Sequence, residues 1–432
     1  MTILLLAGAA SAWTGSVITT QTSQPEGVFA ADLDGDGDLD VLSASSLDGK
    51  TAWYENLGVG NGFGAQNVLI SNGTGAMRVD ALDMDGDGDV DVHATLESGA
   101  AIAENLGGGT FGPLDPTGLT WVAMGKSAAA DFDGDGDPDL AIANAWSDTL
   151  LFQDNLGANG FGAEQLVGNY GYGITHAYVT SADMDADGDL DIISTDLSIY
   201  FGSGEVAVYR NNGGSFSKAH VGSAAWTAAT GDLDGDNDLD IVAVVQSGQL
   251  VVYESTPTGF NAVPIGDCEG HADSVDIGDV DDDGDLDLVC TSGTIIWQLQ
   301  NLGGLSFLAQ AIANDPLWAN AVHLADLDGD SDLDLLVSDW NADAIRWYEN
   351  PLYTPVINPT TTDTGTPPTD TDTDTDALDT DSEPSPSETG DTDVVDAVTP
   401  KGGCGCASGA PPPPTWMVLV IASVLRRRTR QV

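Results

Sequence analysis

The chain has 432 residues and a formal net charge of -58, from 69 acidic and 11 basic residues. Six of the basic residues precede residue 353, and they are scattered along the chain: Lys50, Arg78, Lys126, Arg210, Lys218 and Arg346. Because phosphate binding requires clustered lysine and arginine, this composition excludes a nucleic-acid partner.

The first residues suggest export. Residues 1–12 form an apolar run that ends Ala10-Ser11-Ala12, which is typical of the end of a secretory signal. The run is short and has no basic start, so we interpret it as the remnant of a signal peptide whose true start lies upstream. The alternative is a frayed apolar terminus.

A nine-residue aspartate pattern dominates the next part of the chain. It first appears as Asp32-Leu33-Asp34-Gly35-Asp36-Gly37-Asp38-Leu39-Asp40, with five aspartates at alternate positions. The pattern returns six times, at spacings of 47 to 52 residues. We call these stretches loops one to seven and number their residues from one to nine. A period near fifty residues indicates a repeat architecture with one supersecondary unit per repeat.

The aspartates of the loops are candidate metal ligands. A hard cation such as calcium takes several oxygen ligands, and alternate side chains can wrap inward around it. We expect about seven Ca²⁺ ions. The candidates in loops one to four are Asp32, Asp34, Asp36, Asp38, Asp40, Asp83, Asp85, Asp87, Asp89, Asp91, Asp131, Asp133, Asp135, Asp137, Asp139, Asp183, Asp185, Asp187, Asp189 and Asp191. Those in loops five to seven are Asp232, Asp234, Asp236, Asp238, Asp240, Asp279, Asp281, Asp283, Asp285, Asp287, Asp326, Asp328, Asp330, Asp332 and Asp334.

The segments around each loop predict four short strands per repeat. One strand enters the loop (27–31 in the first repeat), a second follows it directly (41–43), and a third and a fourth come next (52–56 and 66–70). An EF-hand is excluded, because no loop has Glu at position twelve and strands flank the loops. Four antiparallel strands make one propeller blade. The sequence therefore predicts an all-β, seven-bladed β-propeller over residues 13–352.

Closure of the ring is predicted from the two ends of the repeats. The seventh repeat breaks off after Asn350 without a fourth strand, whereas the chain begins with an unpartnered strand at residues 16–20. We expect this N-terminal strand to complete the last blade, because closure hides edges that would otherwise aggregate.

The loops, together with Phe63-Gly64, Phe111-Gly112 and Phe161-Gly162, resemble the FG-GAP/VCBS repeats of integrin α-like β-propellers. The resemblance implies calcium-binding hairpin loops on one face and partner binding on the opposite face. It also implies carboxylate ligands from positions one, three, five and nine, and a backbone carbonyl from position seven, which is Asp38 in loop one.

Loop seven is predicted to be the weakest site or to have a shifted backbone. Position six favours glycine, because its backbone tends towards positive φ. Asn237 of loop five tolerates this conformation, whereas Ser331 of loop seven does not obviously do so. We expect calcium to act as a structural staple rather than as a regulator of binding.

Aromatic residues mark a candidate ligand face in the connections that point away from the loops. They are Trp121, Trp146, Tyr170, Tyr172, Trp226, Trp318 and Trp340. Such residues suit a protein or sugar ligand, and the alternative is packing between adjacent blades. Equivalent positions of the innermost strands carry Asp80, Thr180, Asp276 and His323, for which we predict a wet central channel.

No motif predicts catalysis. The five histidines have no zinc-site spacing, and the chain has no nucleophile elbow, P-loop or dinucleotide fingerprint. Cys268 and Cys290 flank loop six, and whether they pair stays open, because their offsets do not place them directly opposite each other.

The last eighty residues have a different composition. Residues 353–402 are rich in Thr, Asp, Ser and Pro, which predicts a disordered acidic stalk. Residues 403–432 contain Gly403-Cys404-Gly405-Cys406, an apolar run at 416–425 and three arginines at 426–428. This order resembles the MYXO-CTERM sorting tails of myxobacterial surface proteins, which implies a C-terminal processing protease. The alternative is a weak membrane anchor.

Together these features predict a secreted propeller attached to the outer cell surface through its tail alone. Its expected function is calcium-stabilised adhesion to an extracellular protein or glycan, without a catalytic site. Two alternatives remain open: a propeller-type polysaccharide lyase or hydrolase, and a structural component of a surface layer.

Overall fold

The structure is a computed structural model that describes residues 13–71, 75–113, 115–116, 125–171, 173–174, 176–198, 204–268 and 272–351. The described chain forms seven four-stranded antiparallel sheets and one short 3-10 helix, η1 (Gly157–Asn159). The predicted signal remnant, stalk and sorting tail lie outside the described residues. Within the described part of the chain, no helix is long and apolar enough to cross a membrane.

Each sheet is one propeller blade, whose four strands are named in order from the innermost to the outermost. Blade 1 consists of β2 (Pro25–Ala31), β3 (Asp40–Ser45), β4 (Lys50–Tyr54) and β5 (Asn67–Ser71). Blade 2 consists of β6 (Ala76–Leu82), β7 (Asp91–Leu96), β8 (Gly99–Ala103) and β9 (Asp115–Pro116). Blade 3 consists of β10 (Ser127–Ala130), β11 (Asp139–Asn144), β12 (Thr149–Gln153) and β13 (Gln165–Asn169). Blades 4 and 5 are β14 (His176–Ala182), β15 (Asp191–Leu197), β16 (Glu205–Asn211), β17 (Phe216–Ser223); and β18 (Ala225–Gly231), β19 (Asp240–Val245), β20 (Gln249–Thr256), β21 (Gly259–Asp267). Blades 6 and 7 are β22 (Ala272–Gly278), β23 (Asp287–Ser292), β24 (Ile295–Asn301), β25 (Phe307–Ala313); and β26 (Ala319–Ala325), β27 (Asp334–Asp339), β28 (Ala344–Glu349), β1 (Thr14–Thr19).

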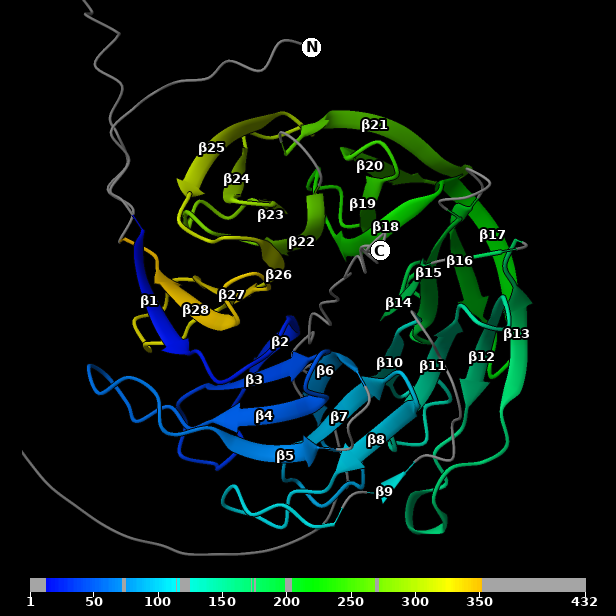
Figure 1. Ribbon diagram of the computed structural model, residues 1–432. Helices are drawn as coiled ribbons and strands as arrows, with labels where there is room; N and C mark the ends of the chain where they lie inside the picture. The colour runs from blue at the N-terminus through cyan, green and yellow to red at the C-terminus, as the bar shows by residue number, and fades with distance from the viewer. Residues whose placement is uncertain are drawn as a thin grey trace, which may run out of the picture. The chain divides into compact units, whose positions relative to one another are not determined.

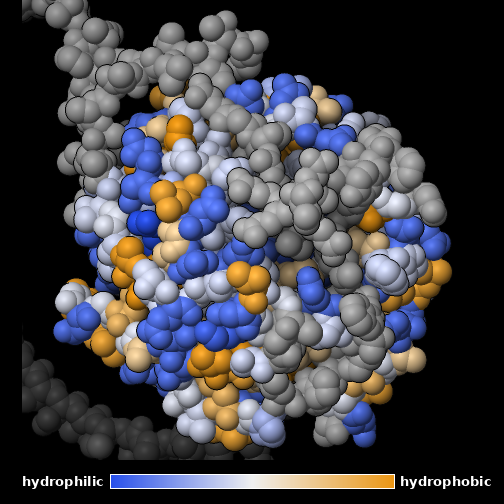
Figure 2. Space-filling view, viewed as in Figure 1, coloured by the Kyte–Doolittle hydropathy of each residue, from blue (hydrophilic) through white to orange (hydrophobic). Residues whose placement is uncertain are grey.

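The seven blades form a closed ring (Figure 1). The innermost strands of neighbouring blades contact one another around the centre, from β2 through β6, β10, β14, β18, β22 and β26 back to β2. The surface on the side seen in Figure 1 is mostly hydrophilic, and its hydrophobic residues are scattered in small groups (Figure 2). The predicted fold class and blade number are therefore confirmed.

The N-terminal strand closes the ring as the sequence predicts. β1 pairs with β28, with Thr14 opposite Glu349 and Ser16 opposite Trp347, and Figure 1 shows the two strands side by side. Trp13 immediately precedes this strand and packs against the cluster that contains Leu333 and Tyr348. This packing of Trp13 was not predicted from the sequence.

Packing between blades explains the aromatic residue after each third strand. The Phe111 ring meets Trp53 of the preceding blade at 5.8 Å, and Phe63 meets Trp347 at 5.9 Å, both edge to face. Clusters of buried residues likewise span neighbouring blades, such as Leu42 with Val79. Such edge-to-face pairs add to the free energy gained by burying the rings.

Buried side chains occupy the centre of the ring. Arg78 on β6 is 1% exposed. Its guanidinium donates hydrogen bonds to Asp80, to the Ser127 carbonyl of blade 3 and to the Val179 carbonyl of blade 4. The four predicted channel residues do lie at equivalent register positions, but they are buried: Asp80, Thr180, Asp276 and His323. The prediction that these four side chains line a wet channel is therefore wrong, because they are not open to solvent.

The two cysteines that flank loop six are joined. Cys268 follows β21 of blade 5, and Cys290 lies in β23 of blade 6, with 6.5 Å between their Cα atoms. The disulfide therefore links two neighbouring blades, whereas the sequence suggested only a bridge across the hairpin of loop six.

Candidate metal centres

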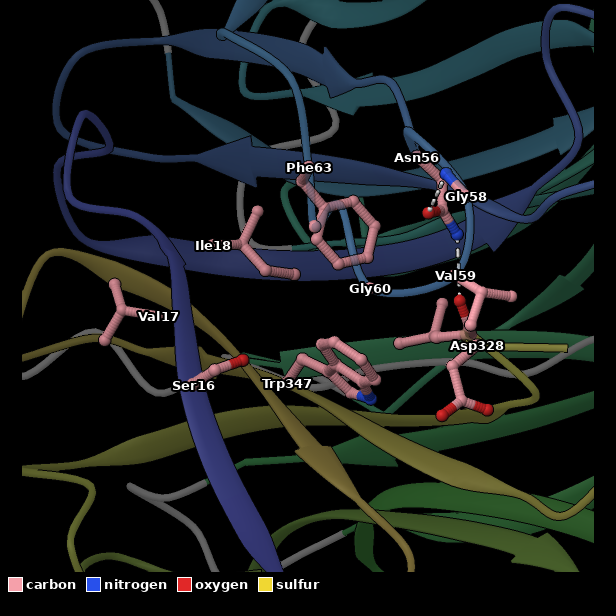
Figure 3. A pocket seen from close by; sticks show the side chains of 12 residues that line it. Ser16, Val17, Ile18, Asn56, Gly58, Val59, Gly60, Phe63, Asp328 and Trp347 are labelled. Carbon is pink, nitrogen blue, oxygen red and sulfur yellow. Dashed lines mark hydrogen bonds between the residues drawn. The ribbon is translucent and has the colours of Figure 1, made fainter. Parts of the chain in front are cut away.

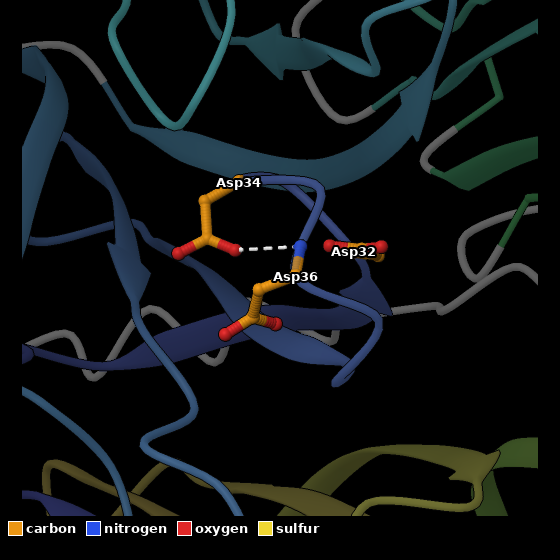
Figure 4. A group of neighbouring side chains, drawn as sticks. All are labelled: Asp32, Asp34 and Asp36. Carbon is orange, nitrogen blue, oxygen red and sulfur yellow. Dashed lines mark hydrogen bonds between the residues drawn. The ribbon is translucent and has the colours of Figure 1, made fainter.

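All seven aspartate loops occupy the same place in their blades. Each joins the innermost strand to the second strand, and position nine is the first residue of that second strand. In loop one, for example, Asp40 begins β3 and pairs with Ala31 of β2. Figure 4 shows Asp32, Asp34 and Asp36 gathered on one turn of this loop, which is the arrangement predicted from the alternating pattern.

The backbone of every loop is folded around its own carboxylates. In all seven loops the N–H of position six donates to the carboxylate of position one. In all seven, the N–H of position seven donates to the carboxylate of position five. Each carboxylate oxygen has two lone pairs, so an oxygen that accepts one of these bonds retains a lone pair for a cation.

Loop seven follows the same backbone path as the others. Ser331 at position six has φ +80°, and its N–H lies 3.0 Å from Asp326 Oδ2. Asn237 in loop five behaves alike, with φ +71°. A shifted backbone is therefore not observed, and the weaker affinity of loop seven stays a prediction. A left-handed serine costs free energy, which is the remaining argument for it.

The donor set fits a hard divalent cation. In each of loops one to five, carboxylate oxygens from three aspartates lie within 4.8 Å of one another, as with Asp83, Asp85 and Asp91. Buried carboxylate oxygens of Asp281 in loop six and Asp332 in loop seven have no hydrogen-bond partner. Because an unpaired buried carboxylate is costly, these oxygens fit the role of ligands. When bound, the ion would neutralise the carboxylates that hold it.

Position nine has a second, structural task. The Asp40 side chain is 0% exposed. Its Oδ2 accepts from the Leu33 N–H at 3.1 Å, and its Oδ1 accepts from the Asn56 N–H at 2.7 Å. Burial raises the pKa of Asp40 to about 6 and that of Asp139 to about 7. This aspartate therefore ties the loop to the third strand, whether or not it also binds a metal.

An additional acidic residue lies beside position three in several blades. Glu55, just after β4, approaches Asp34, and burial together with neighbouring carboxylates, Glu55 among them, raises the pKa of Asp34. Asp154, Glu254 and Glu349 have the same relation to position three of loops three, five and seven. These residues were not predicted from the sequence, although each stands at the end of the third strand, one place before a recurring Asn or Ser.

The recurring asparagine joins neighbouring loops. Asn105 Nδ2 donates to the Val90 carbonyl of its own loop and, at 2.7 Å, to the Leu33 carbonyl of the loop in the preceding blade. The corresponding cross-blade bonds come from Asn56, Asn155, Asn211, Asn301 and Asn350. The loops of consecutive blades therefore lie side by side on one face. Blade 5 differs, because it has Ser255 at this position.

A pocket of about 360 Å³ lies where the N-terminal strand closes the ring. Its lining combines Val17 and Ile18 of β1 with Phe63 and Trp347, and Asp328 of loop seven lies at its edge (Figure 3). This hollow was not predicted from the sequence, because it arises from the contact of the first and the last strands.

The predicted ligand residues are found in different environments. Trp146 is 77% exposed in the turn after β11, whereas Trp318 and Trp340 are half-buried and joined by a 2.8 Å backbone hydrogen bond. Trp226 packs edge to face on His176. Tyr170 is buried in a core cluster, and its hydroxyl lies 2.7 Å from Ser194 Oγ, so it is a packing residue. Trp121 and Tyr172 lie outside the described residues.

A hydrogen-bonded chain in the centre has the residue order of a hydrolytic triad. Ser127 Oγ lies 3.2 Å from His93 Nε2, and His93 Nδ1 lies 3.2 Å from Asp80 Oδ2. Both Ser127 and His93 are 0% exposed. A triad works only where a substrate carbonyl can reach the hydroxyl, so this chain is a structural network.

Solved structures of other proteins share the fold. One is a lectin of Agrocybe aegerita described as recognising non-reducing terminal N-acetylglucosamine, with 21% identity and a TM-score of 0.51 over 67% of this chain and 80% of that chain. Another is BBS1N in complex with ARL6DN, soaked with lead, with 13% identity and a TM-score of 0.53 over 79% of this chain and 98% of that chain. At these identities the likeness concerns the fold alone. No curated protein matches the chain.

The family model of the FG-GAP-like repeat matches five stretches of the chain. They are residues 32–94, 83–142, 131–194, 232–290 and 279–337, which together span more than half of the sequence. Each stretch begins at position one of a loop and ends in the second strand of the next blade. The chain therefore belongs to the family of FG-GAP-like repeat proteins.

Proposed function

We propose that the protein is a calcium-stabilised binding module that is displayed outside the cell. In this proposal the aspartate loops hold Ca²⁺ ions that staple the blades, and the opposite face binds a protein or glycan. The observation that carries the binding role is Trp146, whose side chain is 77% exposed on that opposite face, because tryptophan is enriched among the residues that anchor protein interfaces.

The donor chemistry supports calcium as the ion. The loops offer carboxylate oxygens, whereas transition metals favour nitrogen and sulfur ligands. Extracellular modules of this kind bind calcium with dissociation constants of roughly 10⁻⁴ to 10⁻³ M. Ambient calcium would then keep the loops filled, so the ions act as staples rather than as signals.

The topology places the aromatic residues far from the metal loops. Trp146 lies in the turn between β11 and β12, and Trp340 lies in the turn between β27 and β28. Loops three and seven are at the other ends of β11 and β27, so these turns belong to the remote face. Leu317, which is 58% exposed, lies beside Trp318 and adds apolar surface. Aromatic anchors of this type commonly dominate binding energy.

The fold neighbours favour a binding role over an enzymatic one. The fungal lectin is described as recognising a sugar, and BBS1N is described in complex with a protein. The central Ser127–His93–Asp80 chain, by contrast, is sealed from solvent. Export through the N-terminal apolar run and surface attachment through the C-terminal tail, after processing by a protease, complete the proposal.

The direct test is a binding screen of the secreted full chain on glycan arrays and on intact cells, with and without EDTA. We expect a ligand that Trp146→Ala and Trp340→Ala each weaken about tenfold, because truncating an aromatic anchor costs ~1–2 kcal/mol. Val59→Ala is the matched control, since Val59 is 78% exposed but lies in the turn after β4, on the side of the loops. Equal loss with Val59→Ala, or no loss with either tryptophan variant, would contradict the assigned face.

A further inference from the structure

Loop four differs from the other loops in the residue beside position three. Blades 1, 2, 3, 5 and 7 have an acidic residue in this place and blade 6 has the neutral Gln300, whereas blade 4 has Arg210; the acidic residues are Glu55, Glu104, Asp154, Glu254 and Glu349. The Arg210 guanidinium reaches the loop directly, with 2.6 Å between its Nη1 and Asp185 Oδ2. A positive charge therefore lies against the metal cage of this one loop.

The carboxylate of Asp185 has also changed its partner. In loops one, two, three, five and seven, position three accepts the N–H of position five, as Asp34 does from Asp36 at 3.2 Å. In loops four and six, where Ala186 and Asp282 replace the glycine of position four, the N–H of position five donates to position one: Asp187 to Asp183 Oδ1 at 3.1 Å, and Asp283 to Asp279 Oδ1 at 3.0 Å.

Among the described residues, Asp185 has Arg210 as its hydrogen-bond partner. In loop six the neutral Gln300 donates to the corresponding carboxylate of Asp281. Among the described loops, loop four is therefore the one whose position three is paired with a cation.

In the described part of the chain, blade 5, which follows loop four in the ring, does not donate the side-chain hydrogen bond that the other loops receive from their next blade. In the other blades an asparagine donates across the seam to the carbonyl at position two of the preceding loop. Blade 5 has Ser255 there, and its hydroxyl is too short to make this bond, so its backbone N–H alone anchors Asp240. Within the described residues, loop four therefore lacks the asparagine bond that its neighbours receive from the next blade, and the Arg210–Asp185 pair holds it from its own blade.

We propose that Arg210 replaces the divalent ion in loop four, so that the ring binds one ion fewer than its number of loops. This inference rests on the proposed binding of calcium by the other loops. Replacing a carboxylate with a guanidinium changes the local charge by two units. The Coulomb energy between this changed charge and a doubly charged ion a few ångströms away corresponds to about 100-fold in affinity, even with the dielectric constant of water. Ligand charge count is a main determinant of calcium affinity in oxygen cages.

The test is the number of calcium ions bound by the full chain in equilibrium dialysis, compared between matched variants. Arg210→Glu should bind one ion more than the wild type, because it introduces the carboxylate that five of the other six blades have in this place. Arg210→Lys keeps the charge and should bind the same number as the wild type. Glu254→Arg places the guanidinium in loop five and should bind one ion fewer.

The Arg210 side chain is 37% exposed, so these substitutions leave the core intact, and circular dichroism of each variant verifies the fold. An unchanged ion count in Arg210→Glu overturns the inference while the calcium proposal stands. A wild type that binds no calcium overturns both. A lower count in Glu254→Arg together with a higher count in Arg210→Glu supports the inference, since no general effect on stability moves the two counts in opposite directions.

Discussion

At the scale of single residues, the aspartates of one loop have different tasks. Carboxylates of positions one, three and five converge in loops one and four, and those of positions one, three and nine converge in loops two, three and five. Position nine, such as Asp240, is also buried and holds two backbone N–H groups. The alternating pattern predicted that these side chains gather on one turn, as they do for Asp32, Asp34 and Asp36, whereas their role as metal ligands stays a prediction. The pattern could not separate the tasks, since burial of position nine depends on the third strand, which is distant in sequence.

Burial of position nine predicts a pH dependence for the metal-free protein. The folded-state pKa of Asp139 and Asp287 is raised to about 7, and that of Asp40 to about 6, from 3.8. The folded state therefore binds more protons than the unfolded state between these values, so metal-free stability falls as the pH rises from about 4 to 7. Calcium reverses the trend, because it binds the ionised carboxylates.

The measurement is the melting temperature of metal-free and calcium-loaded protein across this pH range. The expected result is a metal-free melting temperature that decreases towards neutral pH and a calcium-loaded one that does not. A metal-free melting temperature that increases with pH would show that burial of position nine is not what sets its stability.

The asparagine that bridges two loops allows a paired prediction. Asn105→Ser removes two side-chain hydrogen bonds and leaves the Leu33 carbonyl unpaired, so we expect a loss of about 2 kcal/mol in the free energy of unfolding. Ser255→Asn introduces the bridge that blade 5 lacks and should stabilise by about 1 kcal/mol. Urea unfolding of both variants tests this, and destabilisation by Ser255→Asn would refute the equivalence of the two positions.

At the scale of elements, the pairing of the closing strand β1 was predicted from the sequence, whereas the packing of Trp13 beside it was not. The missing fourth strand after Asn350 and the spare strand at the start predicted β1 beside β28, which the structure confirms. Trp13 was assigned no role, because the buried cluster against which it packs, which includes Val322 and Tyr348, is more than two hundred and fifty residues away in sequence. A contact between residues so far apart in sequence produces no local periodicity from which it could be predicted.

Trp13 should therefore contribute to closure of the ring. We expect Trp13→Ala to lower the free energy of unfolding by about 2 kcal/mol, which is less than the loss for a fully buried aromatic residue. Val17→Ala is the control, since Val17 on the same strand is 49% exposed and should change stability by less than about 0.5 kcal/mol. Urea unfolding in the presence of calcium measures the free energy of unfolding of both variants. Equal losses in Trp13→Ala and Val17→Ala would mean that Trp13 does not stabilise the closing strand.

At the scale of the whole molecule, the repeat period predicted most of the fold. The features that it did not predict come from single residues that differ between repeats. Seven loops in register predicted seven blades, and the predicted order of four strands holds in each blade. The wet channel failed as a prediction, because the sequence does not show that the Arg78 side chain reaches across to blades 3 and 4. The ion pair of Arg210 with Asp185 was likewise not anticipated, although Arg210 is a visible exception to the acidic residues in its place.

The central claim is that metal ions staple the ring, and thermal unfolding of the full chain in calcium and in EDTA tests it most directly. With millimolar calcium and dissociation constants of roughly 10⁻⁴ to 10⁻³ M, each filled loop contributes on the order of 1 kcal/mol. The account predicts that EDTA lowers the melting temperature by about 10 °C and that added calcium restores it. An identical melting temperature in EDTA and in calcium would contradict the account.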